Sequence, residues 1–219
     1  MPWQPVCLLI WLIYSLLPGQ LHAKPLNSAV CVGIEPPIIE IIPVPVKAVQ
    51  AQRLSREQIA KRAGRKHLRG YTHTQFFYAP RYLYGMATQP DQQICLYVAK
   101  LALTIGYHKT EILVEDRYPP NSCNSLVVKA HEHQHVDIYN RALSQALTGL
   151  KLALTERLGQ LIIRAPKATL HTQQKQIEKL IKQYVNQASM GIIHEARRLN
   201  GQIDTLKSFQ KLHQQCENW

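Results

Sequence analysis

A helical pattern of apolar residues does most to limit how this chain of 219 residues can fold. From Asn121 or Ser122 to about Leu158, apolar side chains recur every three or four positions, which predicts one long helix. Tyr118-Pro119-Pro120 ends whatever precedes this helix, and either Asn121 or Ser122 is a suitable N-cap. The residues of the apolar stripe mark the side that faces the interior: Val128, Tyr139, Ala142, Ala146 and Leu150.

The same stripe contains three polar residues, His131, Glu132 and His135. They follow the spacing H-E-x-x-H, in which two imidazoles one helical turn apart can ligate a single metal ion. With about 100° of rotation per residue, Glu132 lies close enough to hold a metal-bound water, whereas His133 and Asp137 point elsewhere. Polar side chains in a buried stripe need partners, which a metal ion supplies. A hydrogen-bonded His–Glu core cluster, or a helix face open to a polar cleft, is the alternative.

A second long helix is predicted from about Thr172 to Leu199. Glu195 falls in its apolar stripe, and a carboxylate on another helix, about sixty residues after the second histidine, is typical of one large class of zinc sites. Glu195 is therefore the predicted third metal ligand. The alternative is that Glu195 pairs with Arg197, Arg198 or a backbone group. The predicted stripe consists of Ile177, Ile181, Tyr184, Ala188, Ile192 and Leu199.

The chain after this helix offers two further candidates for the third ligand. Asn200-Gly201 is expected to end the second helix, and Asp204 most simply caps a final one. Asp204 and His194 nevertheless stay open as alternatives to Glu195. The final helix is expected to turn Leu206, Phe209 and Leu212 inward and to end near Cys216 and Trp219.

A β region precedes the first long helix. Apolar runs within Gln92–Glu115 predict two strands, and Gly106-Tyr107-His108-Lys109 between them predicts a hairpin turn. One strand of this hairpin could align an extended peptide by strand addition. Further upstream, Ser55 and Gln58 fit a capping box for a short helix that Gly64 ends.

The rest of the N-terminal part is first extended and then basic. Four prolines between residues 34 and 45 exclude a helix, so Lys24–Pro45 is expected to be an arm packed along the domain and tied down by Cys31. Basic residues between 53 and 69 lead into aromatic residues between 71 and 84. Such a mixture can bind single-stranded nucleic acid, but strand and loop are the favoured interpretation because no nucleic-acid motif accompanies it.

The first 23 residues resemble a secretory signal peptide, with an apolar run from Val6 to Leu17 and a cleavage site after Ala23. No Lys or Arg precedes Lys24, so an uncleaved anchor is the alternative. No later stretch is apolar enough to span a bilayer. The mature chain, from about Lys24, is therefore expected to be secreted or periplasmic.

Cysteine usage agrees with export. Cys7 lies in the predicted signal, and the four cysteines that remain suit two disulfides in an oxidising compartment, with three possible pairings. No C-x-x-C pair is present, which disfavours a thiolate metal site. The four candidates are Cys31, Cys95, Cys123 and Cys216.

The formal net charge is +12, and every charged side chain lies in the mature part. An acidic envelope polymer, lipid head groups or nucleic acid could all be attracted by this charge. The favoured explanation is simpler, namely a soluble basic protein that adheres weakly to anionic surfaces. No specific nucleic-acid partner is expected.

The segment from Ser122-Cys123 to Tyr139 resembles secreted bacterial families of predicted zinc-dependent proteases. The shared features are a strand hairpin, a P-x-S-C-like turn and a helix bearing A-H-E-x-x-H-V. The residues that carry this resemblance are Pro120, Ser122, Cys123, Ala130, His131, Glu132, His135 and Val136. It covers about residues 90–219, including Ile203-Asp204-Thr205 and the terminal Cys and Trp. It implies a zincin-like fold and an envelope or extracellular location, and it transfers no substrate.

Together, these patterns predict an α+β, zincin-like fold in which a small antiparallel sheet or hairpin packs on two long helices. The expected divisions are a signal peptide at 1–23, an arm and basic segment at 24–90 and a metallohydrolase domain at 91–219. The expected function is a zinc metallopeptidase acting on a peptide or protein. Zn²⁺ would be held by His131, His135 and Glu195, with Glu132 as general base toward a zinc-activated water. The alternative is a non-catalytic, basic envelope-binding or structural protein whose metal site is vestigial or structural.

Overall fold

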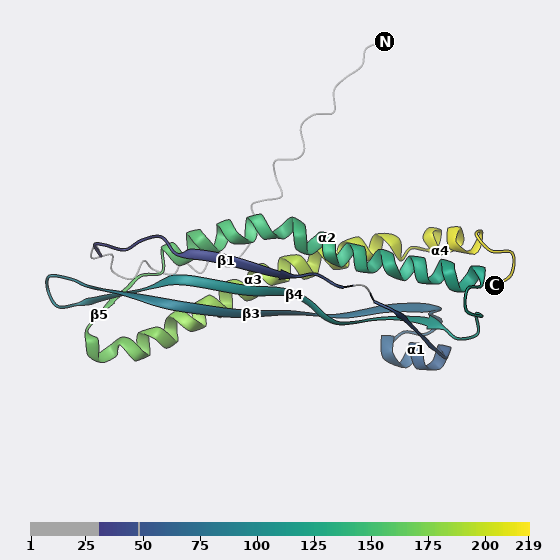
Figure 1. The fold of residues 1–219 in the computed structure, drawn as a ribbon, viewed down its shortest axis with the longest axis horizontal. Coiled ribbons are helices and arrows are strands. Elements are labelled where there is room, and N and C mark those ends of the chain that lie inside the picture. The colour runs from purple at the N-terminus through teal and green to yellow at the C-terminus, as the bar shows by residue number, and fades with distance from the viewer. Residues whose placement is uncertain (1–30, 48) are drawn as a thin grey trace, which may run out of the picture. The chain divides into compact units, whose positions relative to one another are not determined.

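Strand β4 (Ile94–Glu115) pairs with every other strand in the computed structural model, which describes residues 31–47 and 49–219. β3 (Gly70–Thr88) runs antiparallel along one edge of β4. The other edge is paired in turn with β5 (Ile163–Ala165), β1 (Ile38–Val44) and β2 (Ala51–Leu54). β1 and β2 are parallel to β4, whereas β5 is antiparallel, so the sheet is mixed and five-stranded (Figure 1). The prediction of a small antiparallel sheet or hairpin is therefore correct for the pairs of β4 with β3 and β5, and wrong for its pairs with β1 and β2.

The hairpin turn lies between β3 and β4, not at Gly106–Lys109 as predicted. β4 continues through that stretch, where Lys109 has a left-handed φ of 49°. The pairing steps from Gln75 opposite His108 to His73 opposite Glu111, so β4 carries one extra residue there. This is a β-bulge, which uses the same permissive residues as a turn. Gly106–Lys109 therefore does mark an interruption of regular strand geometry, as the sequence suggested. The interruption is a bulge within one strand, however, and not a turn between two strands.

The N-terminal arm forms a strand over Ile38–Val44, and residues 31–37 before it are irregular. β1 lies in parallel register with β4, from Ile38 opposite Lys100 to Val44 opposite Gly106. A side chain at Gly106 would collide with the backbone of Val44, so glycine permits this close approach of the two strands. The arm thus adds an edge strand to the sheet. Its prolines have no backbone N–H to donate, which restricts this strand to an outer position.

Four α-helices complete the described residues. α1 (Arg56–Ala63) begins at Ser55 with the predicted capping box and ends at Gly64 in a left-handed conformation. α2 (Cys123–Gly159) begins at Ser122, whose side chain accepts a hydrogen bond from the backbone of Ser125. α3 (Leu170–Ile203) follows a short 3₁₀ turn, and α4 (Leu206–His213) is the last. The unit is therefore α+β, as predicted.

The end of α3 differs from the expectation. Asn200-Gly201 does not end the helix, which runs on to Ile203, and the backbone N–H of Asp204 donates to the carbonyl oxygen of Asn200. Asp204 does not cap α4 either. Thr205 is the cap, and its side-chain oxygen accepts a hydrogen bond from the backbone of Ser208. The carboxylate of Asp204 is consequently free for another role.

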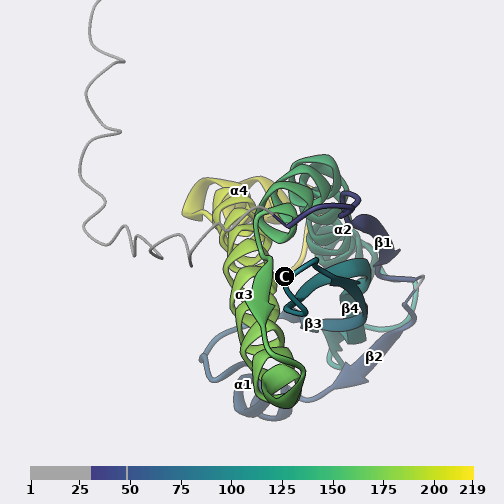
Figure 2. The ribbon, with the colours of Figure 1, turned by 90° about the vertical axis from the view of Figure 1, so that its left-hand side faces the viewer.

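The core lies between the sheet and the two long helices. α2 and α3 lie side by side, and α2 also contacts β4, β1 and β3 (Figure 2). The main contributors to this core are Leu101, Leu103 and Ile105 from β4, Leu143 and Leu154 from α2, and Ile177, Ile181 and Val185 from α3. The apolar stripe of α2 therefore faces the interior, as its periodicity predicted.

Two disulfides join distant parts of the chain. Cys31 is bonded to Cys95 at the start of β4, and Cys123 at the start of α2 is bonded to Cys216 beyond α4. All four candidate cysteines are thus paired, which is compatible with an oxidising, extracytoplasmic compartment. Among residues 31–47 and 49–219, no helix combines the length and apolar character that a membrane crossing needs.

One of the expected domain boundaries falls within the described residues, and the other does not. The predicted signal peptide, residues 1–23, lies outside the described residues. Residues 31–219 form one compact unit. The boundary expected near residue 90 falls in the turn between β3 and β4, which are paired along their length, so it does not separate two bodies.

Candidate metal centre

His131 and His135 occupy neighbouring turns of α2 and are almost completely buried, with 6% and 8% of their surface exposed. Their ring centroids are 4.9 Å apart. Glu132 is buried as well, at 4% exposed, and one ligand atom from each of the three residues lies within 4.8 Å of the others. Helical spacing accounts for the convergence of the two imidazoles, because positions four apart share a face. The group could hold a metal ion.

A second pair of residues four apart meets the histidines from the end of α3. Oδ1 of Asp204 lies 3.2 Å from Nε2 of His131 and 3.2 Å from Nε2 of His135. One turn earlier, Oδ1 of Asn200 lies 2.8 Å from Nδ1 of His135. Because the amide oxygen can only accept, Nδ1 of His135 carries the proton. When the ring is neutral, Nε2 is therefore left with a free electron pair for a metal ion.

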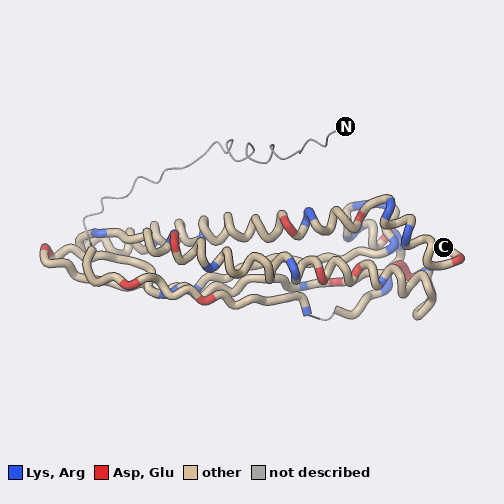
Figure 3. The backbone as a smooth tube through the Cα atoms, turned by 90° about the horizontal axis from the view of Figure 1, so that it is seen from above, with Lys and Arg blue, Asp and Glu red and all other residues tan. Residues whose placement is uncertain are grey.

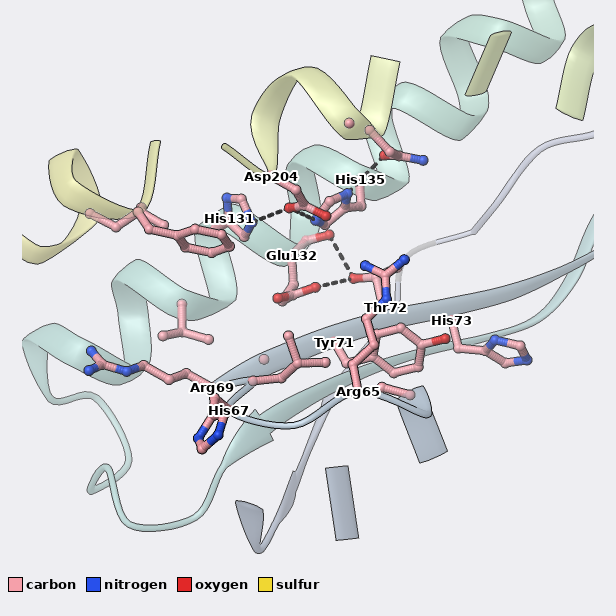
Figure 4. A pocket seen from close by; sticks show the side chains of 18 of the residues that line it. Arg65, His67, Arg69, Tyr71, Thr72, His73, His131, Glu132, His135 and Asp204 are labelled. Atoms are coloured by element: carbon pink, nitrogen blue, oxygen red, sulfur yellow. Dashed lines mark hydrogen bonds and ion pairs between the residues drawn. The ribbon is translucent and has the colours of Figure 1, made fainter. Parts of the chain in front are cut away.

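Figure 4 shows Asp204 between the two histidine rings, with Glu132 on the side toward β3. The hydroxyl of Thr72, on β3, lies 2.8 Å from Oε2 of Glu132 and 3.0 Å from its main-chain carbonyl oxygen, and donates to this residue. Burial raises the pKa of Glu132, and the nearby imidazoles and Thr72 offset only part of that rise. Glu132 is thus held in a fixed position while its basicity is increased.

The protonation of the other members follows from their contacts. Burial by itself would lower the pKa of His135, but hydrogen bonds to Asp204 and Asn200 outweigh it, so the pKa is raised. Burial likewise acts to raise the pKa of Asp204, but its hydrogen bonds with His131 and His135 hold that pKa well below its usual range. Asp204 is therefore ionised at neutral pH, as a metal ligand must be.

Glu195, the predicted third ligand, is not brought to the histidines. Its side chain is 39% exposed and its carboxylate accepts two hydrogen bonds from the guanidinium of Arg198, at 2.6 and 2.7 Å. The stripe of buried residues on α3 is rotated to one side of the predicted stripe. It consists of Ile177, Ile181, Val185, Ser189, Ile192 and Ala196. Glu195 lies at the border of that stripe, where a charged group reaches solvent. The structure thus agrees with the alternative prediction, in which Glu195 pairs with Arg198.

Asp204 and Asn200 could have been found by extending the observed stripe. The buried positions Val185, Ser189 and Ala196 continue in steps of about four residues to Asn200 and then Asp204. The presence of Asn200-Gly201 hid this continuation because it resembles a helix end. Thr72 carried no sequence signal, since its contact with Glu132 joins residues 60 positions apart.

The group opens into a cleft of about 1030 Å³. β3 lines one side with Gly70 to Thr74, and the loop after α1 adds Arg65 to Arg69. The ends of α3 and α4 line the other side, where the Phe209 ring lies 5.9 Å from that of His131. The histidines are therefore buried against the protein but border a space large enough for a chain segment of a substrate.

Gly70 is needed for Glu132 to occupy its place. A Cβ added to Gly70 would lie 2.5 Å from Oε1 of Glu132 and 2.6 Å from Cγ1 of Val128. Gly70→Ala should therefore displace Glu132 and lower the free energy of unfolding by about 1–3 kcal/mol, measured by chemical denaturation.

Gly149→Ala is the matched control for that prediction. Gly149 is exposed on α2, and a Cβ added there would have no atom within 4 Å apart from its chain neighbours and the backbone of its own helix. This substitution should raise the free energy of unfolding by up to about 1 kcal/mol, since alanine favours the helix. Equal effects of the two substitutions would contradict the close packing of Gly70 on Glu132.

Metal affinity should depend steeply on pH. The pKa of His135 is raised above its ordinary 6.5, so the proton that a metal ion must displace is bound up to a higher pH. Affinity for Zn²⁺ is expected to fall about tenfold per pH unit below that raised pKa and to level off above it. Competition with a chromophoric chelator between about pH 5.5 and 8.5 measures this, and an affinity that stays constant below neutral pH contradicts it.

Comparisons with known protein families, with curated proteins and with solved structures find no match to this chain. The class is therefore defined by the fold and the site alone: an α+β protein with a candidate metal centre between two long helices.

Proposed function

We propose that this protein is an exported zinc-dependent hydrolase of peptide or amide bonds. One observation carries the proposal. The imidazoles of His131 and His135 converge on the carboxylate of Asp204, while another carboxylate, the buried Glu132, stands beside them at the edge of an open cleft. Three protein ligands with an open side, next to a separate acid–base group, are typical of catalytic zinc sites.

The donor set suits zinc in kind and in spacing. Zn²⁺ accepts imidazole nitrogen and carboxylate oxygen at about 2.0–2.1 Å, which puts tetrahedral donors about 3.3 Å apart. The 3.2 Å between Asp204 Oδ1 and each histidine Nε2 is close to that spacing. His131, His135 and Asp204 would hold the ion. Bound zinc supplies a Lewis acid that polarises a carbonyl group and makes water more acidic.

Glu132 has the properties of a general base. Its raised pKa gives it a stronger affinity for a proton, and the hydroxyl of Thr72 fixes the orientation of its carboxylate. It would take a proton from the water that attacks the scissile carbonyl, and would then deliver that proton to the leaving amine. Asn200 holds the His135 ring in the orientation that presents Nε2.

A peptide is the favoured substrate because of the strand that lines the cleft. β3 is paired on one edge only among the described residues, and Gly70–Thr74 line the cleft beside Glu132. An extended chain could add to that free edge by backbone hydrogen bonds. This replaces the expectation that a strand within 93–115 aligns the substrate, because β4 is paired with β3 on one edge and with β5, β1 and β2 on the other.

Metal analysis of the purified protein tests the proposal. We expect one zinc ion per chain, and chelation should stop hydrolysis of a fluorogenic peptide mixture while the circular dichroism spectrum stays unchanged. Readdition of zinc should restore the rate. A protein that unfolds on chelation would instead have a structural metal site. A folded protein that binds no metal, and shows only salt-sensitive adhesion to anionic polymers, would favour the envelope-binding alternative.

A further inference from the structure

Positive charge is concentrated on the walls of the cleft that contains the candidate metal centre. Arg65, Lys66 and Arg69 come from the loop between α1 and β3, and Arg197 comes from α3. The acids among the lining residues are Glu132 and Asp204, both of which belong to the centre. Figure 3 shows basic and acidic positions interspersed near the end of the unit where the chain terminates, so the single sign of charge belongs to the cleft walls and not to that whole end. The outer walls of the cleft therefore carry charge of one sign.

These four basic residues have no acidic partner within the part of the chain that the structure describes. Nearby basic residues do: Arg56 pairs with Glu115 at 3.1 Å, and Arg62 pairs with Glu111 at 2.6 Å. A cleft whose outer walls carry one charge attracts ligands of the opposite charge, and the two acids that line this one belong to the metal centre at its floor. Unpaired basic residues also occur elsewhere among the described residues, so what distinguishes the cleft is that four of them line one concave space.

Arg69 is held in place rather than loose in solvent. Its guanidinium carbon lies 4.8 Å from the centre of the Trp219 ring, and its Nη1 atom is buried with no hydrogen-bond acceptor among the described residues. A cation–π contact orients the group but leaves its hydrogen-bond donors unused. A carboxylate is the acceptor that a guanidinium binds most strongly.

We propose that the cleft selects peptides bearing carboxylate side chains. This rests on the proposed hydrolase function, whose substrate class it narrows to acidic peptides. The free edge of β3 aligns the peptide backbone, and the basic walls bind the acidic side chains on either side of the bond presented to the centre. The Trp219 ring is already stacked on His213 and covered by Arg69, so this ring is not free to stack on a base of a nucleic acid.

The test measures binding apart from hydrolysis, using the zinc-loaded Glu132→Gln variant. Two fluorescein-labelled peptides of equal length are compared by fluorescence anisotropy, one alternating Glu with Ala and one alternating Gln with Ala. We expect the Glu peptide to bind at least about tenfold more tightly at low salt, and the difference to shrink toward about 300 mM NaCl. Equal binding of the two peptides overturns the proposal.

Matched variants show whether the cleft is responsible. Arg65→Gln with Arg197→Gln removes one exposed charge from each wall, and should weaken binding of the Glu peptide about fivefold to tenfold. Lys151→Gln with Lys167→Gln removes the same charge from exposed positions outside the cleft and should change binding less than twofold. Equal losses in the two double variants would mean that net charge alone attracts the peptide, and would overturn the assignment to the cleft.

Two further outcomes separate this inference from the proposed function. Selective binding of the Glu peptide by a protein that hydrolyses nothing would refute the hydrolase and keep the acidic recognition. Hydrolysis of neutral and acidic peptides at equal rates would keep the hydrolase and refute the selectivity. A single-stranded oligonucleotide of the same charge that binds more tightly than the Glu peptide would also refute it.

Discussion

Glu132→Gln is expected to reduce peptide hydrolysis by about a thousandfold while leaving zinc content and fold unchanged. Glutamine has nearly the same shape as glutamate and can still accept a hydrogen bond from Thr72, so the packing around this buried position is kept. It cannot accept a proton from water, which removes the general base. Initial rates on a fluorogenic peptide, zinc content and the thermal unfolding midpoint are measured on the same preparation.

Glu178→Gln is the control for that experiment. Glu178 is on the surface of α3, where it pairs with Lys182 at 2.7 Å, so its loss should leave hydrolysis unchanged. If Glu132→Gln keeps the hydrolysis rate of the unmodified protein, the role of Glu132 as general base is wrong. If it loses zinc together with activity, Glu132 is a ligand instead of a base.

Asp204→Ala is expected to weaken zinc binding by at least about a hundredfold. The substitution removes the carboxylate that lies 3.2 Å from both histidine Nε2 atoms, which leaves two protein ligands. Hydrolysis should be lost at zinc concentrations that saturate the unmodified protein. Competition with a chromophoric chelator gives the affinity, and circular dichroism checks that the helices are retained.

Glu195→Ala separates the two candidates for the third ligand. It removes an exposed carboxylate whose partner is Arg198, so zinc affinity should change less than twofold. The opposite pattern, with zinc binding lost in Glu195→Ala and kept in Asp204→Ala, would contradict the geometry of the site and restore the sequence-based prediction.

The periodicity of α2 was sufficient to predict half of the candidate site. His131, Glu132 and His135 lie on one helix, so the 3.6-residue repeat determines their common direction without knowledge of any other element. The buried face of α2 is broad, so a small error in the position of its centre still leaves these three residues inside it. The start of the helix at Ser122 could also be predicted from neighbouring residues alone, because the cap closely follows the prolines in the sequence.

The other half of the site depends on contacts that no local pattern encodes. Asp204 meets His131 across 73 positions of sequence, and Thr72 meets Glu132 across 60. The stripe of buried residues on α3 is narrower. A small error in the predicted position of its centre therefore assigned Glu195 to the buried face and left Asn200 outside it. The hairpin was misplaced for a related reason: whether Gly106 and Lys109 form a turn or a bulge is decided by pairing with β3.

The disulfide between Cys123 and Cys216 makes the two halves of the centre one covalent ring. His131 and His135 lie on one side of the connection between α2 and α3, and Asp204 lies on the other, all within the loop that this bond closes. A single cut in residues 160–169 would therefore produce two fragments that stay linked, with donors on each. Such a nick would leave His131, His135 and Asp204 in one disulfide-linked molecule for as long as that bond stays oxidised.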